Sequence, residues 1–270
     1  MYNLPPIVQA GTDTAIAIGG WSGWLLAALS LALGAGMLLV FGKTSNQEAI
    51  RATKRLLWAH LLELRLYSDE PLMVWKAHTG LLSANVKYLA LMLKPVVILT
   101  VPMLLLFPHF EAFFGMVPLP QGSTANLTVQ MKRAIQPADP TPQLQPSSNV
   151  AVETPGVRSP SDNQVTWRIR ALQPGSGVMK IVLPDGTVEK KIVTGVGPGY
   201  ISGRRVGSFA KMFLYPGETP LSSASVDWVE VSHPPAEVRW LGLQLHWLIW
   251  LLLLSMISAL LLKSRMRVSF

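Results

Sequence analysis

The segment TSNQEAIRATKRLLWAHLLELRLYSDEPLMVWKAHTGLLSANVKYLALMLKPVVILTVPMLLLF, residues 44–107, decides the fold, because it joins two charged arms to a long apolar stretch. Ser45 and Glu48 have the spacing of a capping box, which predicts the start of a first helix. The acidic run that ends at Pro71 predicts the end of that helix and the first turn of a second one. The second helix then continues into the apolar end of the segment. We therefore predict an antiparallel helical hairpin over residues 42–87 that runs directly into an apolar span.

Three apolar stretches reach the length of a bilayer crossing. At 1.5 Å rise per residue, about 20 residues cover a hydrocarbon core of roughly 30 Å. Half of the 270 residues are hydrophobic and 14% are charged, whereas soluble domains carry about 25% charged residues. This composition excludes an ordinary soluble enzyme. We predict three transmembrane helices, at residues 21–41, 88–107 and 240–262.

The basic residues predict the orientation of these spans. Residues 42–87 hold seven Lys and Arg, and the tail 263–270 holds three more without an acid. The positive-inside rule places both in the cytoplasm, so residues 1–20 and 108–239 are expected outside, in a protein of the cell inner membrane. The first span is expected to be retained, because Asp13 and no basic residue precede it. Trp21, Trp24 and Trp240 fit anchors at the outer interface.

The outer residues 108–239 change from helical to alternating periodicity. Ala125, Leu127 and Val129 alternate with polar residues, and Val165 begins a second such run. Several short strands with turn signals between them are typical of an antiparallel sandwich. The Pro-rich residues 136–161 are expected to form an extended loop. The predicted fold class is therefore membrane α-helical, with three transmembrane helices and a cytoplasmic hairpin, plus an all-β, sandwich-like extracytoplasmic domain.

Catalytic and metal chemistry is not indicated. The chain has no Cys, which excludes disulfides, Cys-ligated zinc and thiol catalysis. No Ser/His/Asp arrangement or phosphate-binding loop is recognisable, so we expect a non-enzyme without metal or cofactor. The net charge of +8 is interpreted as a topology signal rather than as affinity for nucleic acid.

Two groups of polar residues are candidates for function. Lys94 lies about two turns into the second span, and an ionisable residue at that depth suggests a functional site. It either lines a polar groove, with Thr100, Ser255 and Ser258 on the same side, or extends its ammonium to the cytoplasmic interface. The hairpin either binds partner proteins and anionic lipids or serves as a solvated connector. Its docking candidates are Arg51, Lys54, Arg55 and Arg65.

The order of these parts resembles the Oxa1/YidC insertase superfamily, and most of all its minimal three-span branch. The shared features are an outward N-terminus, a first span, a cytoplasmic hairpin running into the second span, and an inward C-terminus after the third, over residues 21–107 and 240–270. The resemblance implies an insertion or assembly factor with a polar groove, in which Lys94 replaces the basic residue of the family's first span. Its expected partners are membrane lipids and client membrane proteins. The alternative is a non-catalytic accessory subunit of a hetero-oligomeric membrane complex whose β-domain binds a partner.

Overall fold

The computed structural model describes residues 15–136, 138–266 and 268, which divide into two compact units. The helical unit contains Leu26–Met103 and the described residues from Leu248 onward, and the β unit contains the described residues up to Leu25 together with those of Leu104–Trp247. The mixed fold predicted from the sequence is confirmed in this form, as N-terminal helices followed by a β-rich region of three sheets.

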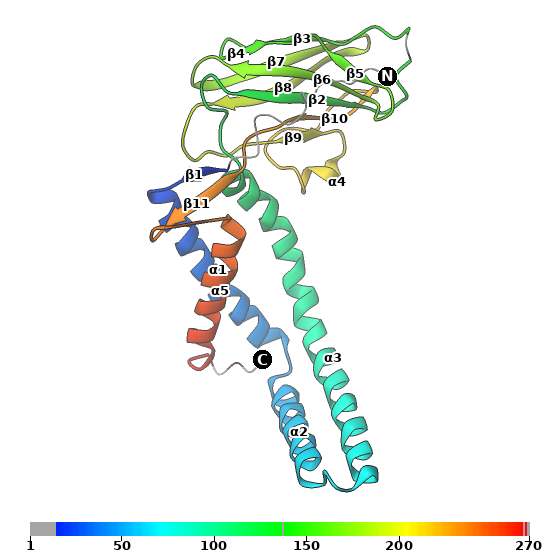
Figure 1. The fold of residues 1–270 in the computed structure, drawn as a ribbon, viewed down its shortest axis with the longest axis vertical. Coiled ribbons are helices and arrows are strands. Elements are labelled where there is room, and N and C mark those ends of the chain that lie inside the picture. The colour runs from blue at the N-terminus through cyan, green and yellow to red at the C-terminus, as the bar shows by residue number, and fades with distance from the viewer. Residues whose placement is uncertain (1–14, 137, 267, 269–270) are drawn as a thin grey trace. The chain divides into compact units, whose positions relative to one another are not determined.

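Among the described residues, two helices are long and apolar enough, by length and composition, to cross a membrane: α1 and α3 with its π-helical end. The third apolar helix, α5, has 17 residues and is shorter than the predicted span. The helices, shown in Figure 1, are α1 (Trp21–Thr44), α2 (Gln47–Leu66), α3 (Pro71–Phe110), the π-helix η1 (Glu111–Gly115), α4 (Phe209–Met212) and α5 (Trp247–Lys263).

The helical hairpin forms from α2 and the first half of α3, which lie side by side in Figure 1. The predicted capping box is wrong by one residue: Asn46 caps α2, and its Oδ1 accepts a hydrogen bond of 3.0 Å from the Ala49 amide. The Ser45 hydroxyl instead donates to the Phe41 carbonyl at the end of α1. Pro71 opens α3 as predicted. Proline is tolerated there because the amide of a first-turn residue has no helical partner.

Small residues let the two arms of the hairpin approach closely. Ala77 and Ala84 of α3 are buried, and Ile50 of α2 is fully buried. A Cβ placed on Gly80 would lie 2.6–2.9 Å from the ring of His60, so the imidazole packs directly on the glycine. The small residues of α3 therefore allow the side chains of α2 to pack close to the α3 backbone.

Close packing at small residues also joins α1 and α5. A Cβ on Gly34 would clash with the backbone oxygen of Ser255. The Ser258 hydroxyl donates a hydrogen bond of 2.9 Å to the carbonyl of Leu31. Close approach through small residues and a Ser hydroxyl is the usual way in which helices associate in an apolar solvent.

The β unit contains three sheets. The largest has the order β4-β6-β2-β10-β9 with β5 also paired to β6, the second has the order β3-β7-β8, and the third has the order β1-β11-β12. The strands are β1 (Ile16–Ile18), β2 (Thr124–Met131), β3 (Gln143–Gln145), β4 (Val150–Val152), β5 (Val157–Ser159), β6 (Gln164–Ala171), β7 (Gly175–Leu183), β8 (Gly186–Thr194), β9 (Arg204–Val206), β10 (Val226–Val231), β11 (Ala236–Trp240) and β12 (Leu243–Leu245).

The two larger sheets share one hydrophobic core. Trp167 and Ile169 of β6 pack in the same buried cluster as Met179 and Ile181 of β7. The alternating residues of β2 and β6 are buried as the sequence predicts. This is the packing expected of two sheets that face each other. The Pro-rich residues 136–161 are not only loop, because they contribute the short strands β3, β4 and β5.

The third sheet changes the boundary of the last apolar stretch. Trp240 ends β11 and Leu243 begins β12, with Leu241 and Gly242 between them at φ of 50° and 81°. Two successive residues with positive φ form the tight turn that suits the twist of a hairpin. The helix therefore begins at Trp247 instead of Trp240. Because β1 pairs with β11, this small sheet also ties the start of α1 to the start of α5.

The contact between α1 and α5 gives a stability prediction. Gly34→Ala places a methyl group against the backbone of Ser255 and is expected to lower the thermal stability of the protein, since overpacking costs about 1–3 kcal/mol. Gly36→Ala is the matched control, because a Cβ there meets nothing within 4 Å. It is expected to be neutral or slightly stabilising. Thermal unfolding in detergent, followed by the helical circular dichroism signal, measures both, and equal effects of the two variants would contradict the close packing.

Candidate functional site

A pocket of about 400 Å³ lies in the helical unit, where the junction of α1 and α2 faces α3. The junction contributes Thr44, Ser45 and Asn46, and α3 contributes Lys94 with its neighbours Ala90 and Leu91. The sequence placed Lys94 among the candidates but gave no sign of its partners at the junction.

Local hydrogen bonds hold the junction in shape. The Thr44 and Ser45 hydroxyls donate to carbonyls one turn earlier in α1, at 2.8 and 2.6 Å. Asn46 is occupied in capping α2. The first helix thus ends and the next begins within three residues, and the polar side chains of the turn are fixed along the wall of the pocket.

Lys94 is the charged residue of this pocket. Its side chain is exposed, whereas the following Pro95 is buried in the helical unit. Within the described residues, no hydrogen bond or ion pair engages the Lys94 ammonium. The six lining residues include no carboxylate and no histidine. The pocket thus offers a cation and polar side chains to a guest, without a general acid or base beside them.

The other three groove candidates do not line this pocket. The Thr100 hydroxyl donates to the Val96 carbonyl of its own helix at 2.8 Å. Ser255 and Ser258 lie together at the contact between α1 and α5, with Ser258 bound to Leu31. The structure therefore brings the two serines together with α1, and it leaves Lys94 with the α1–α2 junction.

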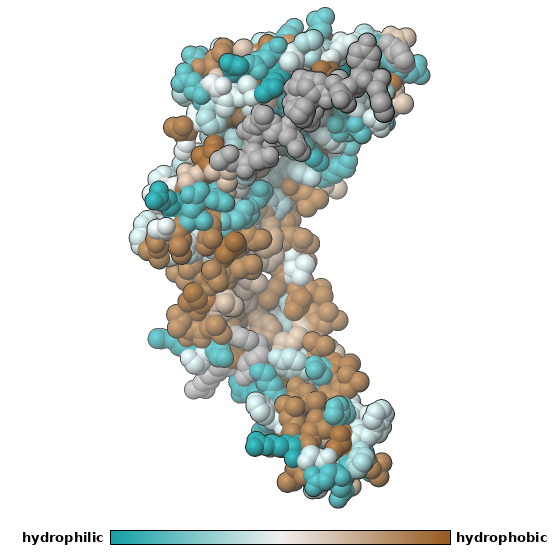
Figure 2. All heavy atoms as spheres, in the orientation of Figure 1, coloured by the Kyte–Doolittle hydropathy of each residue, from teal (hydrophilic) through white to brown (hydrophobic). Residues whose placement is uncertain are grey.

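Three of the four hairpin candidates are exposed, and Lys54 is half-buried at the seam. The Lys54 ammonium lies 5.9 Å from the centre of the Tyr88 ring, across the seam of the hairpin. Arg51, Arg55 and Arg65 are exposed along α2. The visible face of the hairpin in Figure 2 shows hydrophobic side chains beside hydrophilic ones. Six large apolar side chains are more than 60% exposed on the two arms: Trp58, Leu62, Leu66, Leu72, Trp75 and Leu82.

An aromatic cluster surrounds the first residues of α1, the end of α3 and Trp247 in the β unit. The Trp24 and Trp240 rings meet edge to face, with centroids 5.4 Å apart, and Phe110 stacks on Trp247 at 5.8 Å. The Trp247 indole Nε1 donates a hydrogen bond of 2.8 Å to the Glu111 carboxylate. Tryptophan prefers the boundary between apolar and aqueous surroundings. The interfacial role of Trp24 and Trp240 stays a prediction, and Trp240 ends β11 instead of opening the last apolar helix.

The β unit contains a buried charged group that was not predicted from the sequence. Lys190 has no exposed side-chain surface, and its ammonium forms an ion pair with Glu218 and a hydrogen bond of 2.6 Å with the Ser202 carbonyl. Burial lowers the pKa of Lys190 and the Glu218 carboxylate offsets part of this effect. The sequence contains a signal for this burial, because Lys190 occupies an inward position in the alternating pattern of β8, between Val188 and Ile192.

His233 lies close to this pair and is neutral. Its Nδ1 makes a hydrogen bond of 3.0 Å with the Val231 carbonyl, and its Nε2 is buried without a hydrogen-bond partner among the described residues. Burial, and then the charge of Lys190, lower the pKa of His233 to about 4. Removing one member of a buried ion pair is strongly destabilising, so we regard the three residues as a structural group of the β unit.

Comparison of this chain with known protein families, with characterised proteins and with solved structures gives no match.

His233 makes the stability of the β unit depend on pH. Its pKa in the folded protein, about 4, lies below the value near 6.5 of an unfolded chain. The free energy of unfolding therefore carries no penalty from His233 above about pH 6.5. It decreases by on the order of 3 kcal/mol as the pH is lowered towards 4, because the unfolded chain then binds a proton that the folded protein does not. Urea unfolding in detergent at a series of pH values, followed by tryptophan fluorescence, measures this loss.

The His233→Gln variant is expected to flatten that pH dependence, because it removes the group that titrates. His109→Gln is the matched control, since His109 is exposed and pairs with the Tyr200 hydroxyl. An unchanged pH dependence in His233→Gln would contradict the assignment.

Proposed function

We propose that this chain is an integral membrane protein that assists the insertion or assembly of other membrane proteins. In this proposal α1, the second half of α3 and α5 cross the membrane. The hairpin of α2 and α3 lies in the cytoplasm, and the β unit lies on the outer side. The chain would work as a binding and guiding surface rather than as an enzyme.

The uncovered apolar side chains of α3 support the membrane part of the proposal. Leu89, Leu93, Val96 and Val101 are each more than half exposed. Moving a Leu or Val side chain fully out of water gains about 1.5–3 kcal/mol, so a row of them in water is costly. Lipid tails remove this cost. The 17 residues of α5 rise only about 26 Å, which requires local thinning of the bilayer or polar residues held near its edge.

Charge supports the proposed orientation. The helical unit carries basic residues on α2, on the first half of α3 and after α5, and Lys43 and Lys263 mark the ends of α1 and α5. Positive residues beside spans remain in the cytoplasm. The β unit then lies outside.

The pocket around Lys94 is the single observation that carries the proposed activity. It places a cation and three polar residues directly beside the uncovered apolar face of α3. A client segment that enters a membrane has apolar side chains that need an apolar neighbour, and polar flanks that cost several kcal/mol for each unsatisfied group in lipid. The helical unit offers both surfaces along one helix. A guest can therefore exchange lipid for α3 while its polar end keeps polar partners.

A competing role for Lys94 is anchoring alone, with the ammonium at the cytoplasmic edge of the membrane. Lys87 provides the control that separates the two roles. It is an exposed cation two helical turns earlier on α3 and does not line the pocket. Anchoring makes the two lysines equivalent, whereas a role in insertion requires only Lys94.

Lys94→Ala is expected to lower insertion by about fivefold, since a partly exposed electrostatic contact contributes up to about 1 kcal/mol. Purified protein is reconstituted into liposomes, and the insertion of a single-span client with a short polar tail is measured by protease protection. Lys87→Ala is expected to retain the wild-type rate. Equal rates for Lys94→Ala and wild type would remove Lys94 from the mechanism, and wild-type liposomes no better than empty ones would refute the function.

A second candidate function is that of an accessory subunit in a larger membrane complex. The exposed Trp58, Leu62 and Trp75 on the hairpin favour it, because large apolar side chains at an aqueous surface often mark a contact with another protein. Under this function, purification in mild detergent yields a partner in constant stoichiometry, and Lys94→Ala leaves that partner bound.

A further inference from the structure

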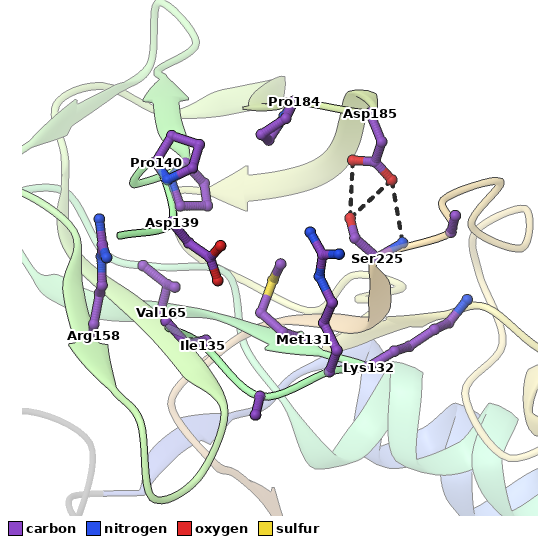
Figure 3. Close-up of a pocket in the computed structure, with 14 residues that line it drawn as sticks. Met131, Lys132, Ile135, Asp139, Pro140, Arg158, Val165, Pro184, Asp185 and Ser225 are labelled. Carbon is purple, nitrogen blue, oxygen red and sulfur yellow. Dashed lines mark hydrogen bonds between the residues drawn. The ribbon is translucent and has the colours of Figure 1, made fainter. Parts of the chain in front are cut away.

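The β unit contains a second pocket, of about 220 Å³, at the end of the core (Figure 3). Met131 at the end of β2, Val165 of β6 and Pro184 at the turn between β7 and β8 line it. Val165 belongs to the buried core, and Met131 and Ile135 pack against that core. The floor is therefore an exposed end of the hydrophobic core, reached between the two large sheets.

Both carboxylates of the pocket are already engaged by the protein. The Asp185 carboxylate accepts a hydrogen bond of 2.9 Å from the Ser225 hydroxyl and another from the Ser225 amide, as the dashed lines in Figure 3 show. Asp139 accepts a hydrogen bond of 2.8 Å from the Gln136 amide. These acids hold the loops of the rim in place.

Two of the three cations are engaged as well. The Lys132 ammonium donates to the Ser223 carbonyl at 2.8 Å, and the Arg158 guanidinium donates to the Thr141 hydroxyl at 3.0 Å. Arg133 is different. In the described part of the chain, no hydrogen bond or ion pair engages its guanidinium, which is exposed at the pocket. The pocket therefore combines an apolar floor with one cation that is available to a ligand.

The size of the pocket limits what it can accept. Sites for small molecules usually measure about 300–1,000 Å³, whereas this pocket measures about 220 Å³. It suits one large side chain rather than a whole cofactor. Single apolar anchors that fill such pockets contribute much of the affinity in protein interfaces.

We propose that this pocket binds a polypeptide partner that presents one large apolar side chain next to a carboxylate. The side chain fills the space over Val165 and Met131, and the carboxylate pairs with Arg133. The proposal extends the second candidate function, in which the protein binds a partner, and its test does not involve membrane insertion.

The probe is a fluorescein-labelled short peptide, Gly-Ser-Phe-Asp-Ser-Gly with an amidated end, titrated with the full-length protein in detergent. Two related peptides replace Phe by Ala and Asp by Asn. Fluorescence anisotropy is expected to show saturable binding that weakens about tenfold or more for the Ala peptide. For the Asn peptide we expect a loss of about tenfold, the usual effect of one charge-assisted hydrogen bond.

Protein variants assign the binding to this pocket. Arg133→Gln is expected to bind the Asp and Asn peptides equally, and Ala224→Trp, at an exposed lining position, is expected to block both. Lys180→Gln removes the same charge from β7 outside the pocket and is expected to bind as wild type does. Absence of saturable binding, equal binding of the Phe and Ala peptides, or an Asp preference that survives Arg133→Gln would each overturn the proposal.

Discussion

The exposed apolar half of α3 imposes the constraint on which the rest of the structure depends. Leu89, Leu93 and Val101 are more than half exposed, and the proposed placement in a membrane would remove them from water by giving the helix an apolar solvent. In such a solvent the hydrophobic effect no longer drives helices together, and association depends on close packing and hydrogen bonds. The contact between α1 and α5 has that form, with Gly34 against Ser255 and Ser258 bound to Leu31. This packing is of the kind that the proposed function requires, because in that proposal the helical unit lies in lipid.

The β unit differs from the helical unit in where its apolar side chains lie. Its two large sheets bury their apolar faces in one core. Charges inside it are paired: Lys190 contacts Glu218, and the nearby His233 stays neutral. The two candidate binding pockets also differ in their apolar surroundings. The pocket of Lys94 adjoins an uncovered apolar helix, whereas the pocket of Arg133 lies at the end of a water-excluding core. The two proposals therefore assign separate surfaces of the chain to a membrane segment and to a polypeptide partner.

The sequence predicts the parts of this fold that have a strong period. Strands β2 and β6 alternate because one face of each is buried, and the hairpin arms carry helical spacing and a proline at the start of α3. The turn at Leu241 and Gly242 escapes prediction because both residues lie inside an apolar run that also suits a helix. The pocket of Lys94 escapes it because residues 44–46 and 90–94 meet only in the folded chain. The partner of Lys190 is 28 residues away, so its burial is visible in the strand pattern but its pairing is not.

The orientation of the two units is the central claim, and the absence of native cysteine permits a direct measurement. Ser68→Cys places one thiol at the exposed turn between α2 and α3, and Ser161→Cys places one on the exposed surface of the β unit. Spheroplasts are treated with a membrane-impermeant maleimide before and after permeabilisation of the inner membrane. The account predicts labelling of Ser161→Cys in intact spheroplasts and of Ser68→Cys only after permeabilisation. The reverse pattern, or equal labelling of both thiols in intact spheroplasts, would contradict it.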